Sequence, residues 1–545
     1  MNHLAAADYA VFLIYFVVVV GYGYWIYRSK QSGATNTKDF FLAEGSLTWW
    51  AIGASLIASN ISAEHFIGMA GSGFAMGLAI SSYEWIAAAT LVIVAAFFIP
   101  IYLKNNISTM PQFLAQRYSD TVSTILAIFW LVVYVLVNLT SILYLGAIAI
   151  ESLAGIPFTT CTIGLAIFAI FITLGGMNVI GYTDVIQVVV LIFGGLVVTY
   201  LALQLVADKS GVDGVWNGLA TLRTRADDHF HMFFAEGHPH YNALPGMSLV
   251  LGGMWINNLY YWGCNQYIVQ RALGADLPTA RNGILFAAFL KLLIPLIVVI
   301  PGIAAFVLYQ EGTFATAMTD ANGSVKPDHA YPVLMNLLPT GMKGLAFAAL
   351  TAAVVASLAG KCNSISTIFT LDIYRKFVDK DASEQKLVRV GRWAVVVSFI
   401  VAILIAPMLR SFDQVYQYIQ EYTNFLTPGV FAIFALGFFW KRATNRAALT
   451  VAILTIPLSI LFKFWPAISE LVGERAAEIP FLHRTTWVFC IDVLLMVVIS
   501  LTDPASEGNP KGLAIDKAMF RVSRSFLAGS AAIAVVLLTL YTLFW

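Results

Sequence analysis

The chain has 545 residues, of which 59% are hydrophobic and only 11% are charged, and its mean hydropathy is +0.79. Soluble domains carry about 25% charged residues, so this composition excludes an ordinary soluble protein and indicates a polytopic membrane protein. The net charge of +1 and the absence of a basic tail in the sequence argue against a nucleic-acid partner.

Apolar segments long enough to span a lipid bilayer recur along the whole chain, about fourteen in number. In chain order they lie near residues 8–28, 47–75, 78–103, 121–151, 157–178, 183–206, 245–270, 282–309, 343–374, 390–409, 414–440, 445–464, 482–502 and 525–545. Basic residues follow the first segment and are more frequent in alternate loops thereafter. Because Lys and Arg favour cytoplasmic loops, this pattern predicts a multi-pass protein of the cell (inner) membrane with both termini outside.

Two of the predicted outer loops are long, at about residues 207–244 and 310–342. The first contains the stretch HFHMFFAEGHPH at residues 229–240, in which His229, His231, His238 and His240 alternate in pairs. Histidine pairs are common metal ligands, so a metal site is one interpretation. The more ordinary interpretation is a solvated loop that packs over the outer surface.

Polar and ionisable side chains are concentrated within a few of the apolar segments. Such residues are costly in lipid and are therefore candidates for function. They are Asn60, Glu64 and His65; Tyr83 and Glu84; Asp184 and Gln187; Asn257, Asn258, Tyr260, Tyr261, Trp262, Asn265 and Gln266; Lys291; Ser357, Lys361, Asn363 and Ser364; and Gln417, Gln420 and Glu421. One such residue alone often does no more than join two helices by a hydrogen bond. Amides, charges and aromatic rings together bind hydroxyls and the apolar C–H face of a sugar, so the set favours a neutral monosaccharide.

Two of the predicted spans are interrupted by polar and glycine-rich stretches. These are GASLIASNISAEHFIGMAG at residues 53–71 and WINNLYYWGCNQY at residues 255–267. The two spans are separated by an odd number of crossings and therefore enter the membrane from opposite sides. Inverted repeats with discontinuous first helices are typical of LeuT-type transporters, which bind their solutes at the membrane midplane.

The expected fold is thus an all-α membrane protein with a LeuT-type 5+5 inverted repeat. The chain would form a single polytopic domain, residues 1–545. The first repeat is predicted at 47–206 and the second at 245–440. One extra helix at 8–28 precedes the repeats, and three extra helices at 445–545 come after them.

Several motifs resemble those of the sodium/solute symporter family. GGMNVIGYTDVIQ at residues 175–187 is similar to the signature of that family. The two interrupted stretches, SSYEW at 81–85 and QYIQEYT at 417–423 resemble the bacterial sodium/galactose members in particular. The likeness extends over nearly the whole chain. It implies the same fold and a secondary symporter in which inward sodium flow drives sugar uptake, with Na+ as the coupling ion and without an organic cofactor.

The resemblance also implies roles for individual residues. The side chains implied to hydrogen-bond the sugar are Asn60, Glu84, Asn258, Lys291 and Gln420. Tyr261, with Trp262 beside it, is implied to stack on the sugar and to form the inner gate. The implied outer gate consists of Met69, Tyr83 and Tyr416, which would cap the sugar from outside, and Tyr83 is also an implied sugar contact. The implied sodium ligands are the carbonyls of Ala58, Ile61 and Ala353 and the hydroxyl of Ser357, with Asp184 on the ion exit path.

Three departures from the family pattern change groups at these implied sites. His65 stands where the galactose symporters have a sugar-binding glutamine, and Ala87 replaces a serine near the sugar. Ala356 replaces the first of two adjacent sodium-ligand serines, which leaves four oxygens in the implied shell. His65 is therefore a candidate for setting the choice of sugar, and Ala356 for weakening sodium binding.

Lys361 is a fourth departure. It lies four residues after Ser357 and one turn nearer the cytoplasm on the same helix face, which puts it on the ion exit path. Its ammonium is expected to pair with Asp184, to compete with sodium, or to snorkel to the inner interface. Because Lys361 could supply a positive charge in place of sodium, an alternative to sodium coupling is proton-coupled or sodium-independent transport. In that case His65 or Glu64 would take up and release the proton.

Other classes of function fit the sequence less well. A different small solute, such as an amino acid, a vitamin or a sialic acid, is compatible with the same fold. A haem-bearing membrane enzyme needs several histidines within spans, and of the eight histidines only His65 lies inside one, with His483 at the very end of another. An ATP-driven pump needs a phosphate-binding loop that ends in Gly-Lys-Ser/Thr, which this sequence lacks. The sequence therefore predicts a secondary transporter and not an enzyme.

Overall fold

The computed structural model describes residues 4–30, 47–174, 176–319, 323–411, 415–471, 473, 476–513 and 515–545. These residues form helices joined by turns, with one isolated β-bridge between Thr319 and Val325. The predicted all-α class is therefore confirmed.

The first half of the described chain is a succession of long and short helices. The main ones are α1 (Ala6–Lys30), α3 (Trp49–Asn60), the π-helical turn η1 (Glu64–Met69), α4 (Ala70–Met76), α5 (Ser82–Ile93), α6 (Ile99–Lys104), α7 (Met110–Arg117), α8 (Asp120–Val132), the π-helical turn η4 (Val133–Leu139), α9 (Thr140–Ala154), α10 (Phe158–Leu174), α11 (Gly176–Lys209), α12 (Val215–Arg225), α13 (Gly246–Leu251) and α14 (Gly253–Gly263).

The second half of the described chain continues in the same way. Its main helices are α15 (Gln266–Leu273), α16 (Leu277–Gln310), α17 (Ala315–Met318), the short turn η6 (Pro327–His329), α18 (Ala330–Met335), α19 (Met342–Thr367), the π-helical turn η7 (Ile368–Tyr374), α20 (Arg375–Phe377), α21 (Glu384–Ile405), α22 (Val415–Thr423), α23 (Thr427–Phe439), α24 (Asn445–Lys463), α25 (Trp465–Glu470), α26 (Phe481–Thr502) and α27 (Arg524–Leu543).

Among the described residues, ten helices or uninterrupted helical runs are long and apolar enough to cross a membrane. They are Ala6–Ile26, Glu64–Lys104, Asp120–Ala154, Ile180–Lys209, Leu277–Gln310, Met342–Phe377, Glu384–Arg410, Asn445–Lys463, Phe481–Thr502 and Arg524–Leu543. Two shorter helices, α10 and α23, are also apolar. The protein is thus multi-pass, as its composition predicted.

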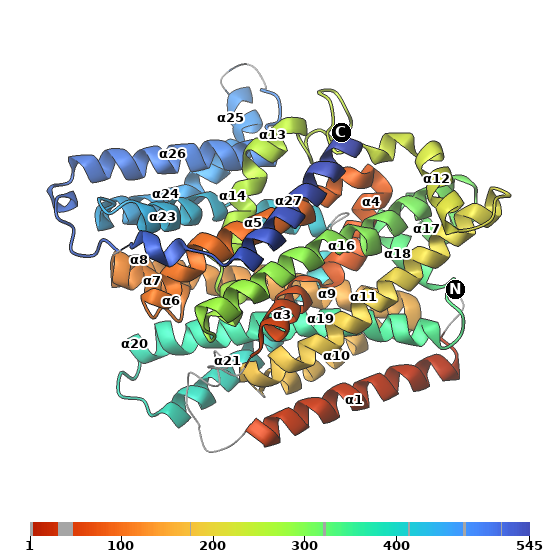
Figure 1. Cartoon of the computed structure of the whole chain (residues 1–545), viewed down its shortest axis with the longest axis horizontal. Helices are drawn as coiled ribbons and strands as arrows, with labels where there is room; N and C mark the ends of the chain where they lie inside the picture. The colour runs from red at the N-terminus through yellow and green to blue at the C-terminus, as the bar shows by residue number, and fades with distance from the viewer. Residues whose placement is uncertain are drawn as a thin grey trace.

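The helices run broadly in one direction and form a single bundle (Figure 1). α16 passes through the middle and packs along α3, α4 and α5, while α19 packs against α1, α10 and α11. α24 and α26 form one edge together with α23, and α1 forms the opposite edge. This arrangement surrounds α3 and α4, which carry the first polar stretch, with other helices.

The first polar stretch is a break between two helical halves, and its own residues cap the second half. α3 ends at Asn60, and helical structure resumes as the π-helical turn η1. The Ser62 hydroxyl accepts a hydrogen bond from the Glu64 N–H (3.1 Å), and the Ser62 N–H donates to Nδ1 of His65 (3.4 Å). This reciprocal pair is a capping box in which histidine takes the usual place of glutamate or glutamine. The local sequence therefore specifies a helix start in the middle of the span.

The second polar stretch contains a break of the same kind. α14 ends at Gly263, and α15 begins at Gln266. The Asn265 side chain accepts a hydrogen bond from the Tyr267 N–H at 3.3 Å, as expected of asparagine at a helix N-cap. Irregular backbone at membrane depth is tolerated only where protein or a cavity takes up its polar groups. The two breaks therefore point to the place where a site is built.

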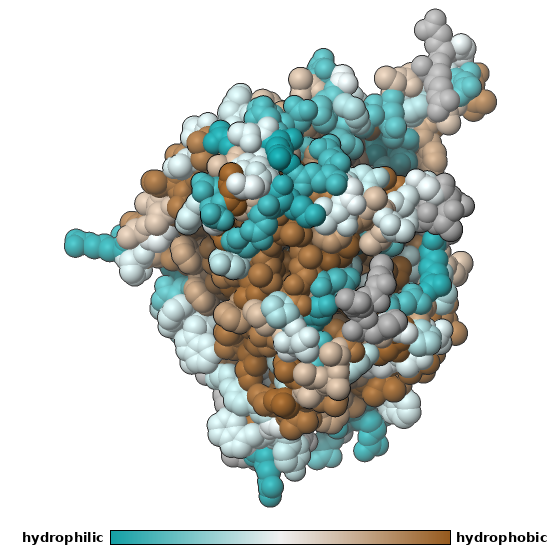
Figure 2. Space-filling view, turned by 90° about the vertical axis from the view of Figure 1, so that its right-hand side faces the viewer, coloured by the Kyte–Doolittle hydropathy of each residue, from teal (hydrophilic) through white to brown (hydrophobic). Residues whose placement is uncertain are grey.

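The outer faces of several helices carry large apolar side chains that no other part of the described chain covers. Examples are Leu13 and Val17 on α1, Leu404 on α21, and Val535 and Leu538 on α27, all more than half exposed. The end of the molecule in Figure 2 has hydrophilic residues gathered over its upper part and apolar residues at its centre. Exposed apolar faces of this extent suit contact with lipid tails.

Candidate solute and ion sites

A cavity of about 680 Å³, counted with its open mouth, lies where the two breaks face α5, α16 and α22. It is lined by Asn60, Glu64, His65, Tyr83, Glu84, Ala87, Asn257, Asn258, Tyr260, Tyr261, Trp262, Lys291, Gln420, Thr423, Asn424 and Thr427. All nine side chains predicted to contact a sugar are among these residues, although their segments are far apart in the sequence.

A buried ion pair forms one wall of the cavity. Lys291 on α16 is 0% exposed, and its Nζ lies 2.5 Å from Oε2 of Glu84 on α5. The same ammonium donates to Oδ1 of Asn60 and lies 5.1 Å from the ring centroid of Trp262. The amide of Asn60 in turn donates to the Tyr261 hydroxyl at 3.0 Å. Five predicted solute contacts therefore form one connected network around a pair whose charges cancel.

His65 links the break after α3 to this ion pair. Its Nε2 lies 3.3 Å from Oε1 of Glu84, while its Nδ1 faces the N–H of Ser62. A neutral imidazole with its proton on Nε2 satisfies both contacts, because Nδ1 then accepts and Nε2 donates. The histidine therefore holds Oε1 of Glu84 in place through Nε2 and stabilises the start of η1 through Nδ1.

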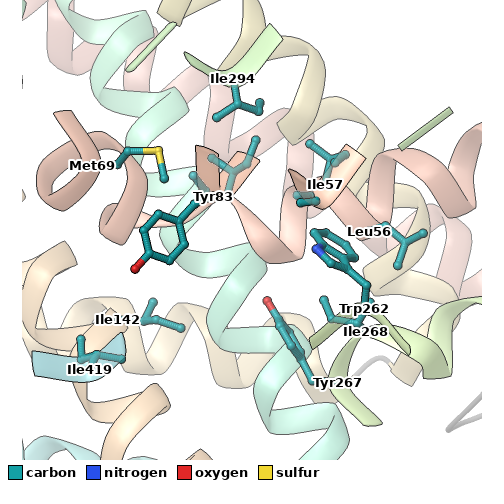
Figure 3. Packing of buried hydrophobic residues seen from close by; sticks show 14 of the residues in the cluster. Leu56, Ile57, Met69, Tyr83, Ile142, Trp262, Tyr267, Ile268, Ile294 and Ile419 are labelled. Carbon is teal, nitrogen blue, oxygen red and sulfur yellow. The ribbon is translucent and has the colours of Figure 1, made fainter. Parts of the chain in front are cut away.

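The predicted outer-gate residues lie in different environments. Tyr83 lines the cavity, whereas Met69 is fully buried in the apolar core. Figure 3 draws Met69 and Tyr83 at one side of this core and Trp262 and Tyr267 at the other. The third predicted residue, Tyr416, falls within residues 411–418, whose side chains are outside the described part of the structure.

Backbone carbonyls released by the break after α3 converge on one hydroxyl of α19. Oγ of Ser357 lies 2.8 Å from the carbonyl oxygen of Ser59, 3.2 Å from that of Ile61 and 3.4 Å from that of Ala58. We call these four oxygens the carbonyl cluster. Hard cations are bound by such oxygen ligands, so three of the four predicted sodium ligands, Ala58, Ile61 and Ser357, lie together. The neighbouring side chain of Ala356 is buried and supplies no oxygen.

An arginine lies beside the carbonyl cluster, although the sequence pattern did not indicate one there. Arg271 on α15 is 2% exposed, and its guanidinium donates to the hydroxyls of Ser55 (2.9 Å) and Ser59. Ser55 also donates to Oδ2 of Asp184 at 2.6 Å. Asp184, which was predicted on the ion exit path, is thus tied through Ser55 to Arg271.

Two of the interpretations offered for Lys361 are wrong. The side chain is 5% exposed, so it does not snorkel to the interface. Its Nζ donates to Oδ1 of Asn138 at 3.2 Å, whereas Asp184 accepts from Ser55 and has Arg271 as its cation. The expected pairing with Asp184 is therefore not formed, because Asp184 is linked through Ser55 to a different cation, Arg271. Competition with sodium is the interpretation that stays open.

The family of the chain is established by comparison with known proteins. A family model described as "Sodium:solute symporter family" matches residues 40–455, which is most of the chain. The chain belongs to the sodium:solute symporter family. The predicted family is therefore confirmed, and the protein is a sodium-coupled solute symporter, a secondary transporter and not an enzyme.

Named relatives and solved structures agree with this assignment. The symporter is 44% identical to a Vibrio parahaemolyticus protein named sodium/glucose cotransporter, over 99% of both chains. It is 36% identical to the Mus musculus sodium/myo-inositol cotransporter 2, over 84% of this chain and 69% of that one. Its fold superposes with a TM-score of 0.75 on an outward-open, substrate-bound Na+-coupled sialic acid symporter, covering 92% and 98% of the two chains at 21% identity.

The histidine-rich segment of the symporter packs as the ordinary interpretation predicted. His229 stacks on Phe306 with ring centroids 4.0 Å apart, and its Nε2 lies 3.0 Å from the Phe74 carbonyl oxygen. His238 stacks on Phe234 at 4.1 Å. Within the part of the chain that the structure describes, no group of three potential ligands is placed to hold a metal ion. His229 therefore joins the loop to α4 and α16, and His238 packs within the loop itself.

Sequence reasoning overlooked several residues of the symporter's cavity. Thr423, Asn424 and Thr427 line the same wall as Gln420. Their spacing from Gln420 of three, four and seven residues is the spacing of one helix face and could have identified them in the sequence, although Asn424 lies in the turn between α22 and α23. Arg271 carried no comparable signal, because a basic residue after an apolar run reads as an ordinary cytoplasmic flank.

Proposed function

We propose that this symporter couples inward sodium flow to the uptake of a neutral monosaccharide of the glucose or galactose kind, by alternating access. The observation that carries the proposal is the buried Glu84–Lys291 pair in a cavity whose other lining is mostly amides, hydroxyls and aromatic rings, together with His65 and the carboxylate of Glu64. Because the two charges satisfy each other at 2.5 Å, they favour hydroxyl groups over a charged solute. The names of the relatives support this choice, since glucose and myo-inositol are both neutral polyols.

The network suggests a role for each side chain. Asn60, Glu84, Asn258, Lys291 and Gln420 hydrogen-bond the sugar hydroxyls, with His65 held against Glu84. The ring of Tyr261 stacks on the sugar and blocks its way inward, and Trp262 supports it at a ring distance of 5.2 Å. Tyr83, Met69 and Tyr416 close the outer side.

Sodium is proposed to bind at the carbonyl cluster, with the carbonyl of Ala353 as a further ligand. The cation would join the unwound segment after α3 to α19 and so favour the conformation that accepts sugar. An ion that binds one conformation more tightly shifts the population toward it, which is all that coupling requires.

The architecture is proposed to be the 5+5 inverted repeat of residues 47–206 and 245–440, with one helix before and three after, about fourteen spans in total. Both termini are proposed to lie outside the inner membrane. In support, Asp8 of α1 accepts from the N–H groups of Gly341 and Gly344 after the second long loop. The other end of the chain also packs on a long loop, where the Met232 N–H donates to the Phe544 carbonyl at 2.8 Å.

Radiolabelled sugar uptake into proteoliposomes tests the proposal, with a panel of sugars and with or without a sodium gradient. Wild type should concentrate glucose or galactose only when sodium flows inward. Gln420→Ala should abolish this uptake, whereas Thr450→Ala, which removes an exposed hydroxyl of α24, should not. Concentration of sugar driven by a pH gradient without sodium would instead support proton coupling and refute the proposal.

A further inference from the structure

Lys361 is enclosed by three aromatic rings, one of which, that of Tyr261, also lines the cavity. Its Nζ lies 3.7 Å from the ring centroid of Tyr267, 5.3 Å from that of Tyr134 and 5.8 Å from that of Tyr261. The ammonium donates a hydrogen bond to Oδ1 of Asn138. Aromatic faces and an amide oxygen stabilise a cation without neutralising it. The rings and the amide oxygen can therefore hold an ammonium at this point without cancelling its charge.

The charged groups around Lys361 are already balanced before any ion binds. Glu64 of η1 attracts the ammonium, and Arg271 of α15 repels it. Arg271 is in turn attracted by Asp184 of α11. Two cations and two carboxylates thus flank the break after α3. A sodium ion that enters the carbonyl cluster brings one uncompensated positive charge into this low-dielectric region.

Lys361 is close enough to the carbonyl cluster to oppose that ion. Ser357 and Lys361 lie one turn apart on the same face of α19, where side chains are about 5–6 Å apart at Cβ. The hydroxyl of Tyr267, whose ring contacts the ammonium, is hydrogen-bonded to Ser357. Only one side chain therefore separates the lysine charge from the proposed sodium ligands.

We propose that Lys361 is a built-in cation that opposes sodium: its charge lowers the affinity of the carbonyl cluster for sodium and favours release of the ion toward the cytoplasm. This inference rests on the proposed sodium coupling and on the proposed orientation of the chain. Ala356 acts in the same direction, because it removes an oxygen from the same turn of α19. The charge of Lys361 and the missing oxygen at Ala356 would both lower the affinity of this site for sodium.

The size of the effect is set by Coulomb's law. Two unit charges about 8 Å apart at an effective dielectric constant of 20 repel each other enough to change affinity about 30-fold. Glu64 offsets part of this repulsion because it lies near the same ammonium. Removal of the lysine charge should therefore lower the half-saturating sodium concentration about tenfold.

The experiment compares wild type with Lys361→Met, which removes the charge but keeps an apolar chain among the three rings. Binding of 22Na+ to the purified protein and the sodium dependence of sugar uptake in proteoliposomes are both measured. Lys361→Arg keeps the charge and should retain the wild-type sodium affinity. Lys376→Met, which removes a partly exposed lysine paired with Asp120 further along the same helical run, is the matched control.

Tighter sodium binding by Lys361→Met, with an unchanged KM for sugar at saturating sodium, supports the proposal. Equal or weaker sodium binding by the folded variant overturns it, as does a failure of both proteins to bind 22Na+. If the Lys361 variants do not fold, Asn138→Asp is measured instead. It places a compensating carboxylate beside the intact ammonium and should also tighten sodium binding. Unchanged sodium binding by this variant overturns the proposal. Failure of wild type to concentrate sugar on a sodium gradient refutes the proposed function separately, because the comparison of 22Na+ affinities needs no transport.

Discussion

The strongest test of the solute site is the removal of the Lys291 charge by Lys291→Met. Lys291 is fully buried, and its ammonium contacts both Glu84 and Asn60. Loss of one partner of a buried ion pair costs about 3–5 kcal/mol, because the remaining charge is left uncompensated. The variant should therefore unfold at a lower temperature than wild type in the same detergent.

The same change should also abolish sugar uptake. A hydrogen bond to a charged group contributes about 1.5–3 kcal/mol, so loss of the ammonium should weaken sugar binding about 10- to 150-fold. The two effects separate in the double variant Glu84→Gln, Lys291→Met. It removes the uncompensated carboxylate and should recover much of the lost thermal stability, but it should still fail to concentrate sugar.

The assay pairs thermal unfolding of the purified protein with uptake into proteoliposomes, and Lys376→Met serves as the control for loss of a partly exposed lysine. Three results would refute the reasoning. They are wild-type uptake by Lys291→Met, a wild-type unfolding temperature for that variant, and a double variant no more stable than the single one. The first would place the solute elsewhere, and the other two would mean that the ion pair is not buried as described.

Three further predictions concern the ion site, the choice of sugar and an acidic residue outside the spans. Ala356→Ser adds a hydroxyl to the turn of α19 that carries Ser357, so the half-saturating sodium concentration in uptake assays should fall. An unchanged value contradicts the proposal that the sodium site lacks an oxygen at this turn. His65→Gln keeps a capping-box side chain at the start of η1 and should leave folding intact. It should shift the sugar preference toward galactose, measured by the competition of a panel of sugars for uptake. An identical order of sugar preference would exclude His65 from sugar recognition. In the segment between α16 and α19, burial raises the pKa of Asp328 to about 7. The folded protein therefore keeps this proton to a higher pH than the unfolded chain, and its stability falls as pH rises from about 4 toward 7. Asp328→Asn should unfold at a higher temperature than wild type at pH 8 and at the same temperature near pH 4; parallel curves of unfolding temperature against pH for the two proteins would contradict this.

The sequence alone determined the class of the molecule and the places where its helices break. Apolar runs of spanning length have few other uses, and the residues that interrupt two of them, Ser62 and Asn265, cap the next helix through contacts within three residues. Such local hydrogen bonds depend only on neighbours in the chain, so they can be read from the sequence. The nine predicted solute contacts all belong to the polar and aromatic residues of the spans, but it is the resemblance to sodium/solute symporters that singles them out among those residues.

Only the tertiary structure decided which of these polar groups satisfy one another. Glu84 and Lys291 are separated by more than two hundred residues, and their pairing depends on how α16 packs against α5. Lys361 is the clearer case, since its spacing from Ser357 is compatible with a partner in Asp184, with the interface or with sodium. α15 places Arg271 near Asp184, and Lys361 lies among three tyrosines instead. The partner of a buried charge depends on how the helices pack, which the spacing along one helix does not show.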